Sequence, residues 1–419
     1  MELDQTRPEL ADEALPGFGE LMNSPVPGPL VGLYDAAGST IESVERIQVT
    51  WHPGTSVTVR FRVRGGGGDL HGRRDVVAVL GHRPEDAIHL ESEDASVAMW
   101  VVPHDPYLPG LRSALHVPTV GLLLSDLGFR GEVVSCQLRA YRPGRRALVQ
   151  VTGGSSSVFL KILRPSDVDA LHKRHRALAA FVPVPDSLGL DRELGIVVMP
   201  ALAGDDLRTI LRNGSRPIPQ AAEIARLVEG LPEPEHDWRV ASPVDGVPRF
   251  VDLLGRLLPE TKARLDSLAD AISSVDTASL SPIHGDFHEA QVLVSSGRPV
   301  GLVDLDTFGW GHPTDDAATM LGHLHLLAPG CESPRRVIHL ARELNRLWDG
   351  RHDPIELRLR VAATVLGLAT GPFRIQSRDW PEETKARLAV AEQWVDSSQS
   401  LNERSLIPVS AASHEADRS

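Results

Sequence analysis

Alternation of apolar and polar positions is clearest in two stretches that share one design. Residues 45–63 carry the runs RIQVT and SVTVRFRV on either side of a His-Pro-Gly turn, and residues 134–152 read VSCQLRAYRPGRRALVQVT. This alternation around Pro-Gly predicts an antiparallel hairpin in each stretch. Two interpretations of the similarity stay open. The two stretches are either ordinary hairpins with a common turn or parts of a duplicated sheet whose first copy lies in an N-terminal cap.

The remaining pattern predicts a β-rich front and a helical back. Further β-type runs occur at 75–80, 96–102, 157–163 and 195–199, while 107–127 is helical or irregular and 166–180 is helical. Apolar spacing of three and four recurs at 250–274, 332–348, 356–370 and 383–396, and a strand-rich island at 283–305 interrupts it. This order predicts an α+β fold with two lobes and not alternating βαβ units.

The same pattern suggests five segments. Residues 1–40 are rich in Pro and Gly and are expected to form a partly irregular arm, followed by an N-terminal β-rich, cap-like domain at 41–130. A second β-rich unit spans 131–204, and a helical lobe with the β island spans 205–400. The polar residues 401–419 are expected to form a flexible tail.

Composition narrows the function classes. The 419 residues are 42% apolar and 24% charged, as in globular proteins. The two cysteines, Cys136 and Cys331, exclude a disulfide framework and a thiolate metal cluster, and they fit a reducing compartment. The acidic N-terminus has no secretory signal, and no apolar run is long enough to span a membrane. The net charge of −13 disfavours nucleic-acid binding. We therefore expect a cytoplasmic protein with no membrane or nucleic-acid partner.

The β island carries the candidate chemistry, in the stretch HGDFHEAQVLVSSGRPVGLVDLDTFGWGHPTDDA. Phosphoryl transfer requires a carboxylate near the acceptor hydroxyl, oxygen ligands for Mg²⁺, and a cation near the phosphates. Asp286 lies in a tight turn, and the predicted hairpin that follows Gln291 places Asp304 at a strand end beside that turn. Carboxylate and amide oxygens suit Mg²⁺. Lys161, on a strand of the front unit, supplies a cation.

This ordered pattern resembles the aminoglycoside phosphotransferase and choline kinase branch of the protein-kinase-like fold. That branch carries an HGDxHxxN loop, then a strand, an Asp-containing segment and GxPxxD. The matching residues, clear over about 135–325, are His284, Gly285, Asp286, His288, Gln291, Asp304, Gly311, Pro313 and Asp316.

The resemblance implies a two-lobed protein-kinase-like fold with a β-rich N-lobe and hinge at 131–204, a mostly helical C-lobe and an N-terminal cap-like extension. It implies ATP and Mg²⁺ as cofactors. Asp286 would act as catalytic base, and Asp304 as the principal Mg²⁺ ligand beside Gln291. Asp306 is either a further ligand or a turn cap. The implied structural residues are His284 and Asp316, and the implied nucleotide contacts are Lys161, Met199, Ala201 and Arg145.

Two departures from the family pattern are informative. Gln291 stands where most relatives have Asn, which is similar to actinobacterial maltokinases and glucosamine kinases, enzymes that also carry an N-terminal cap. The acidic partner of Lys161 is not evident, because the helix after it contains no Glu; Asp169, His172 and His175 are the candidates. Arg145, at the hairpin tip, either contacts phosphate or is a solvated turn residue.

The sequence predicts a phosphotransferase that acts on a hydroxyl of a small molecule, with a sugar or amino sugar as acceptor, in a monomer or homodimer. The alternatives are an aminoglycoside-modifying kinase, which would need a strongly acidic pocket, and a catalytically silent nucleotide-binding regulatory protein. Four residues are candidate substrate contacts, although each also fits a solvated, core or surface role: His288, Glu289, Trp310 and Arg374.

Overall fold

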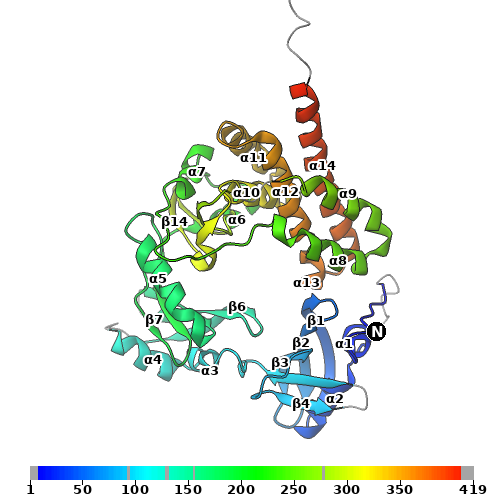
Figure 1. The fold of residues 1–419 in the computed structure, drawn as a ribbon. Helices are drawn as coiled ribbons and strands as arrows, with labels where there is room; N and C mark the ends of the chain where they lie inside the picture. Colours follow the sequence, from blue (N-terminus) through cyan, green and yellow to red (C-terminus); the bar gives the residue numbers. More distant parts are fainter. Residues whose placement is uncertain (1–7, 92–94, 128–131, 154–155, 276–278, 407–419) are drawn as a thin grey trace, which may run out of the picture.

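A computed structural model describes residues 8–91, 95–127, 132–153, 156–275 and 279–406. Two β-sheet units precede a helical lobe (Figure 1), so the predicted α+β architecture is confirmed. Residues 407–419 of the expected tail lie outside the described residues, and residues 401–406 of that tail belong to the last helix.

The two β units contain five-stranded antiparallel sheets with the same strand order. The first sheet is ordered β1-β2-β3-β5-β4, from strands β1 (Thr40–His52), β2 (Ser56–Gly66), β3 (Gly72–Leu80), β4 (Ile88–Glu91) and β5 (Ser96–Val101). The second is ordered β6-β7-β8-β10-β9, from β6 (Ser135–Arg142), β7 (Arg146–Gly153), β8 (Ser156–Leu163), β9 (Gly189–Asp191) and β10 (Ile196–Pro200). Both predicted hairpins are present, and the repeated order supports the interpretation of a duplicated sheet.

Helices distinguish the two units. In the second, helix α5 (Val168–Leu178) connects the third and fourth strands, whereas a short loop makes that connection in the first. Residues 8–40, expected to be partly irregular, instead contain helices α1 (Phe18–Asn23) and α2 (Gly28–Ala36). Their apolar side chains are buried against the first sheet, among them Phe18, Leu21, Leu30 and Tyr34. The Pro and Gly residues therefore separate short helices and do not prevent them.

The N-terminal domain packs against both other parts of the molecule. Alternate residues of β3 enter different cores, as its period of two requires. Val76 and Ala78 lie in a core that also holds Phe373 and Trp380 of the helical lobe. Val77 and Val79 lie in a core with the second sheet. That core also takes in helices α3 (Gly110–Ala114) and α4 (Val117–Asp126), which join the two sheets in sequence.

The helical lobe confirms the four predicted helical stretches. Its helices are α6 (Leu207–Arg212), α7 (Ala221–Glu229), α8 (Val247–Leu257), α9 (Lys262–Ile272), α10 (Asp315–Leu327), α11 (Pro334–Asp349), α12 (Pro354–Leu368), α13 (Gly371–Arg374) and α14 (Trp380–Leu406). Short strands form the β island: β11 (Asp205–Asp206), β12 (Ser281–Ile283), β13 (Val292–Ser295), β14 (Arg298–Leu302) and β15 (Gly309–Gly311). Within the described residues, no helix combines the length and apolar character needed to cross a membrane.

Candidate active site

The loop between β12 and β13 is held by a buried carboxylate. Asp316, at the start of α10, accepts hydrogen bonds from the backbone N–H groups of His284 and Gly285, both at 2.8 Å. Burial raises the pKa of Asp316 to about 7, and the two N–H donors oppose this rise. Gly285 has φ +81°, and a Cβ there would lie 2.7 Å from the Thr307 carbonyl oxygen, so the turn requires glycine.

His284 orients the next residue of this loop. Its Nε2 lies 3.0 Å from the Val303 carbonyl oxygen, which can only accept a hydrogen bond, so this nitrogen carries the proton. Nδ1 is then free to accept from the Asp286 N–H at 3.3 Å. The Asp286 side chain is 41% exposed. Burial raises its pKa to about 6, and the nearby Asp304 charge adds to this, while Arg146 and Arg142 lower it.

Asp304 and Asp306 follow β14 and share two cations that belong to the second sheet. Lys161 Nζ lies 2.7 Å from Asp304 Oδ1 and also contacts Asp306. Arg146 bonds Asp304 at 3.2 Å and contacts Asp306 as well. Burial alone would raise the pKa of Asp304, but the charges of Lys161 and Arg146 hold it well below its usual range. Four charged groups therefore alternate in sign where the second sheet meets the β island.

These contacts identify the acidic partners of Lys161. None of the three candidates on α5 pairs with it: Asp169 binds Arg192, and His172 contacts Ser187. His175 is buried and lies 2.6 Å from the Pro185 carbonyl oxygen through Nδ1. The partners of Lys161 are instead Asp304 and Asp306, more than 140 residues downstream. Such a long-range pairing leaves no local signal in the sequence.

Arg146 is a site residue that the sequence reasoning missed. The family resemblance implied Arg145, whose side chain is exposed and forms no hydrogen bond or ion pair with the described residues. Register explains the difference. Arg142 pairs with Arg146 across the hairpin, and Leu148, two residues on, pairs with Lys161. Paired and alternate residues share a face of a sheet, so Arg142, Arg146 and Lys161 lie on one face. The alternation of apolar and polar residues in the hairpin already indicated this shared face.

A cavity of about 730 Å³ lies between the second sheet and the helical lobe. One part of it is apolar, and the other is charged. The apolar part includes Leu148, Phe159, Met199, Ala201 and Leu293, and the charged part includes Arg142, Arg146, Lys161 and Asp304, together with Gln291. Met199 and Ala201 both line the cavity. The Ala201 N–H, however, donates to the Ser157 carbonyl oxygen at 3.1 Å.

His288 and Glu289 are buried, which excludes the alternative of solvated loop groups. Arg208 Nε donates to Glu289 Oε1 at 2.6 Å. The His288 ring stacks on His323, with centroids 4.1 Å apart, and burial lowers the pKa of both histidines to about 3. Gln291 Nε2 lies 3.1 Å from His288 Nε2. Arg208 belongs to α6 and His323 to α10, so no local pattern in the sequence links them to this loop.

The other two candidate substrate contacts lie apart from one another. Trp310 is in β15, where its N–H donates to the Trp238 carbonyl oxygen at 2.7 Å, and it does not line the cavity. Arg374 ends α13 and is exposed. The pKa of Arg374 is lowered by loss of solvent and by the charge of Arg145, and the Asp286 carboxylate opposes this lowering. Arg374 is therefore in electrostatic reach of the catalytic loop, and Trp310 belongs to the scaffold of the β island.

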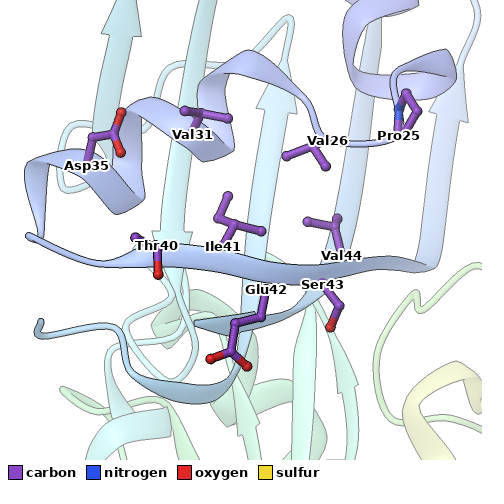
Figure 2. A pocket seen from close by; sticks show the side chains of 9 residues that line it. All are labelled: Pro25, Val26, Val31, Asp35, Thr40, Ile41, Glu42, Ser43 and Val44. Atoms are coloured by element: carbon purple, nitrogen blue, oxygen red, sulfur yellow. The ribbon is translucent and has the colours of Figure 1, made fainter. Parts of the chain in front are cut away.

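A second cavity lies far from these groups, in the N-terminal domain (Figure 2). It has a volume of about 350 Å³ and lies between α2 and β1. Val26 and Val31 face Ile41 and Val44 across it. Its ionisable groups are Asp35 and Glu42, which do not converge with a nucleophile or a base. The chemistry of the molecule is therefore concentrated in the larger cavity and the loop beside it.

A family model matches the part of the chain that contains Arg146, Lys161, the catalytic loop and Asp304. The model of the phosphotransferase enzyme family, APH, covers residues 138–352, just over half of the chain. The chain belongs to this family. It is accordingly a phosphotransferase enzyme of the class that acts on small molecules, and the resemblance to the aminoglycoside phosphotransferase family is confirmed. No curated protein matches the sequence significantly.

Three solved structures to which the chain is similar carry names of phosphotransferases. A candidate aminoglycoside phosphotransferase from Ralstonia eutropha JMP134 shares 14% identity over 67% of this chain and 97% of its own, with a TM-score of 0.48. Macrolide 2'-phosphotransferase type I shares 18% identity over 65% and 96%, with a TM-score of 0.44. A thermostable variant of aminoglycoside phosphotransferase APH(4)-Ia, solved with ADP and hygromycin B, shares 14% identity over 66% and 97%, with a TM-score of 0.42.

Proposed function

We propose that this phosphotransferase transfers the γ-phosphoryl group of ATP to a hydroxyl of a sugar or amino sugar. The observation that carries the proposal is the cavity with one apolar and one charged part. An adenine ring fits the part lined by Met199 and Phe159, and the phosphates fit the part lined by Lys161 and Arg146. Asp286 lies on the adjoining loop, beside the charged part, where an acceptor hydroxyl would meet the γ-phosphate.

The residues around Asp304 fit Mg²⁺. Asp304 and Gln291 line the same cavity and offer a carboxylate and an amide oxygen, the donors that this hard cation prefers. Bound Mg²⁺ would neutralise charge on the phosphates. Both carboxylates of the Asp304–Asp306 pair face Lys161 and Arg146. When the phosphates arrive, these two cations can bind them and release carboxylate oxygens.

In this proposal Asp286 orients the acceptor hydroxyl and takes its proton. Its raised pKa, about 6, suits a general base at neutral pH, because it is ionised there and still holds a proton better than an ordinary aspartate. His284 and Asp316 keep the loop in place. Lys161 is buried between two carboxylates. The absence of an acidic partner for Lys161 on α5 suggested a silent protein, but Asp304 and Asp306 of the helical lobe take that position.

The alternative of an aminoglycoside-modifying kinase is less well supported. A polycationic acceptor requires an acidic surface near the base. Charges of both signs surround Asp286: Asp304 raises its pKa, in addition to burial, and Arg146 and Arg142 lower it. These mixed charges do not form the strongly acidic surface that a polycation requires. A neutral sugar is compatible with these surroundings.

The test is ADP release from Mg-ATP with a panel of sugars, amino sugars, aminoglycosides and amino alcohols. We expect one acceptor class to stimulate release, and Asp286→Asn to abolish that stimulation while ATP still binds. If ATP binds but no acceptor stimulates release, and ADP forms equally in both proteins, the proposed transfer is wrong.

A further inference from the structure

One ring nitrogen of His175 lies buried beside the larger cavity without a hydrogen-bond partner. His175 belongs to α5, lines this cavity and is 1% exposed. Its Nδ1 lies 2.6 Å from the Pro185 carbonyl oxygen, which can only accept a hydrogen bond, so Nδ1 carries the proton. Nε2 is then an acceptor, and it forms no hydrogen bond within the part of the chain that the structure describes. A buried acceptor that stays unpaired is unfavourable, so we expect a donor to reach this nitrogen when the protein is at work.

His175 is the one polar member of the buried face of α5. The buried residues of this helix recur at spacings of three and four, which places them on a single face: Val168, Leu171, His175 and Leu178. Val168 and Leu171 belong to a small core against the second sheet, and Leu178 belongs to the core of the helical lobe. His175 therefore lies between these two cores, at the junction of the second sheet and the helical lobe.

Strand register places Lys161 on the face of the second sheet that α5 covers. Lys161 of β8 pairs with Val197 of β10, and paired residues share a face of a sheet. Val197 and Met199 form the small core together with residues of α5. The side chains of Lys161 and His175 thus lie on the same side of the sheet, and both line the larger cavity.

The helical lobe brings the present partner of Lys161 to the same helix. Asp306 contacts Lys161 and lies in a 3-10 turn that packs against α5. Arg174 Nε donates to the carbonyl oxygen of Phe308, two residues after Asp306, at 3.0 Å. Arg174 directly precedes His175. Register, core packing and this hydrogen bond therefore place the lysine ammonium and the unpaired nitrogen in one neighbourhood.

The donors of Lys161 exceed the acceptors that it now has. An ammonium group carries three N–H donors and no acceptor, and Asp304 and Asp306 accept from it in the described structure. A bound nucleotide brings phosphate oxygens that compete with Asp304 for this cation. The flexible lysine stem allows Nζ to turn toward α5. Burial lowers the pKa of His175 to about 4, so the ring is neutral at pH 7 and the Nε2 lone pair is available.

We propose that His175 positions Lys161 in the nucleotide-bound protein: Nε2 accepts one hydrogen bond from the ammonium, while Asp306 and the phosphates accept the others. Helix α5 thus supplies a neutral acceptor to the lysine, to which it offers no carboxylate. This inference deepens the proposed function and rests on it for the identity of the ligand in the cavity. His175 acts through Lys161 and is a positioning residue.

Two substitutions separate the roles of the two ring nitrogens. His175→Asn keeps a donor near the position of Nδ1 and removes the acceptor, whereas His175→Gln keeps an acceptor near the position of Nε2 and removes the donor to Pro185. His172→Asn is the matched control on the same helix, because His172 contacts Ser187 and does not line the cavity. Isothermal titration calorimetry of the full chain measures the Kd of ATP, with and without Mg²⁺, and urea unfolding measures the stability of each variant.

We expect His175→Asn to weaken ATP binding by about 10- to 100-fold, as loss of a hydrogen bond to a charged group does. His175→Gln should keep most of the affinity, and the control should keep all of it. A role in the fold alone gives the opposite order, because only Asn preserves the hydrogen bond to Pro185. Weaker binding by His175→Gln than by His175→Asn therefore refutes the inference.

A double-mutant cycle shows whether the effect passes through the lysine. In the Lys161→Met background, His175→Asn should change the Kd of ATP by less than about twofold. An equal loss in both backgrounds would show that His175 acts independently of Lys161 and would overturn the proposal. ATP binding that His175→Asn leaves unchanged also refutes it, with the kinase assignment intact, whereas absence of ATP binding to the unaltered chain refutes both.

Discussion

Asp105 anchors the arginine-bearing hairpin to the N-terminal domain, and its removal should loosen that hairpin. Its buried carboxylate accepts hydrogen bonds from the Tyr141 hydroxyl and the Gly144 N–H, both at 2.7 Å, and from the Tyr107 N–H at 2.9 Å. Trp100 Nε1 donates in turn to the Tyr141 hydroxyl at 2.9 Å. The turn that carries Arg142 and Arg145 thus depends on one side chain that is almost 40 residues away in sequence.

The cost of losing this carboxylate follows from the number of donors. A hydrogen bond to a charged acceptor contributes about 1.5–3 kcal/mol, and buried donors left without a partner add to the loss. Two of the three donors are buried. Allowing for non-additivity, we expect Asp105→Ala to lower the free energy of unfolding by about 3–5 kcal/mol. Asp105→Asn should cost less, since its amide oxygen still accepts at one position, and Tyr141→Phe, which removes one donor, should cost about 1–2 kcal/mol.

Urea unfolding of the three variants measures this order. Hydrogen exchange of a peptide that contains residues 141–147 measures the local effect, because the Gly144 amide loses its acceptor. We also expect the KM for ATP to rise in Asp105→Ala, since Arg146 begins the second strand of the hairpin. A loss of stability below about 1 kcal/mol, with unchanged exchange in this peptide, would show that Asp105 does not hold the turn.

Three further predictions concern the catalytic loop and the helical lobe. Asp286→Asn should reduce kcat by roughly 10²–10³-fold with little change in ATP affinity; near-normal transfer would exclude Asp286 as the base. Because a base must be deprotonated and the pKa of Asp286 is about 6, kcat/KM should rise with pH up to about 6 and level off above it; a profile that is flat between pH 5 and 7 would contradict this. Arg360 is fully buried and pairs with Asp315 and Glu356, each at 2.7 Å. Arg360→Leu should therefore cost about 3–5 kcal/mol in urea unfolding by leaving Asp315 unpaired, and a cost near that of the same change at Arg335, which is exposed on α11, would refute the argument.

Local patterns predicted much of the fold. The two hairpins depend on alternation around Pro-Gly, and the long helices depend on apolar spacing, so neighbouring residues suffice to recognise them. The helices α1 and α2 were missed because each is short and lies between Pro and Gly residues. Their apolar side chains become meaningful only when the first sheet covers them.

The candidate site also contains residues that local sequence order identifies and residues that only the fold brings together. Asp286, Gln291 and Asp304 lie within one short island, where order and spacing identify them. The partners of Lys161 and the cluster of Arg208, Glu289 and His323 join segments that are far apart in sequence. Only the folded chain determines these pairings. Arg146 is an intermediate case, because the alternation of the hairpin strands already places it on the same sheet face as Lys161.

The two contacts of the N-terminal domain change the mechanics of the molecule. Two lobes joined by a single hinge segment can rotate apart. Here the N-terminal domain is packed against both the second sheet and the helical lobe. The three then form a closed linkage, in which neither lobe can swing outward unless an apolar interface shears or separates. Exposing apolar surface costs about 25 cal/mol per Å². We therefore expect substrates to enter and products to leave through small sliding motions, with the spacing between base and nucleotide set before either ligand arrives.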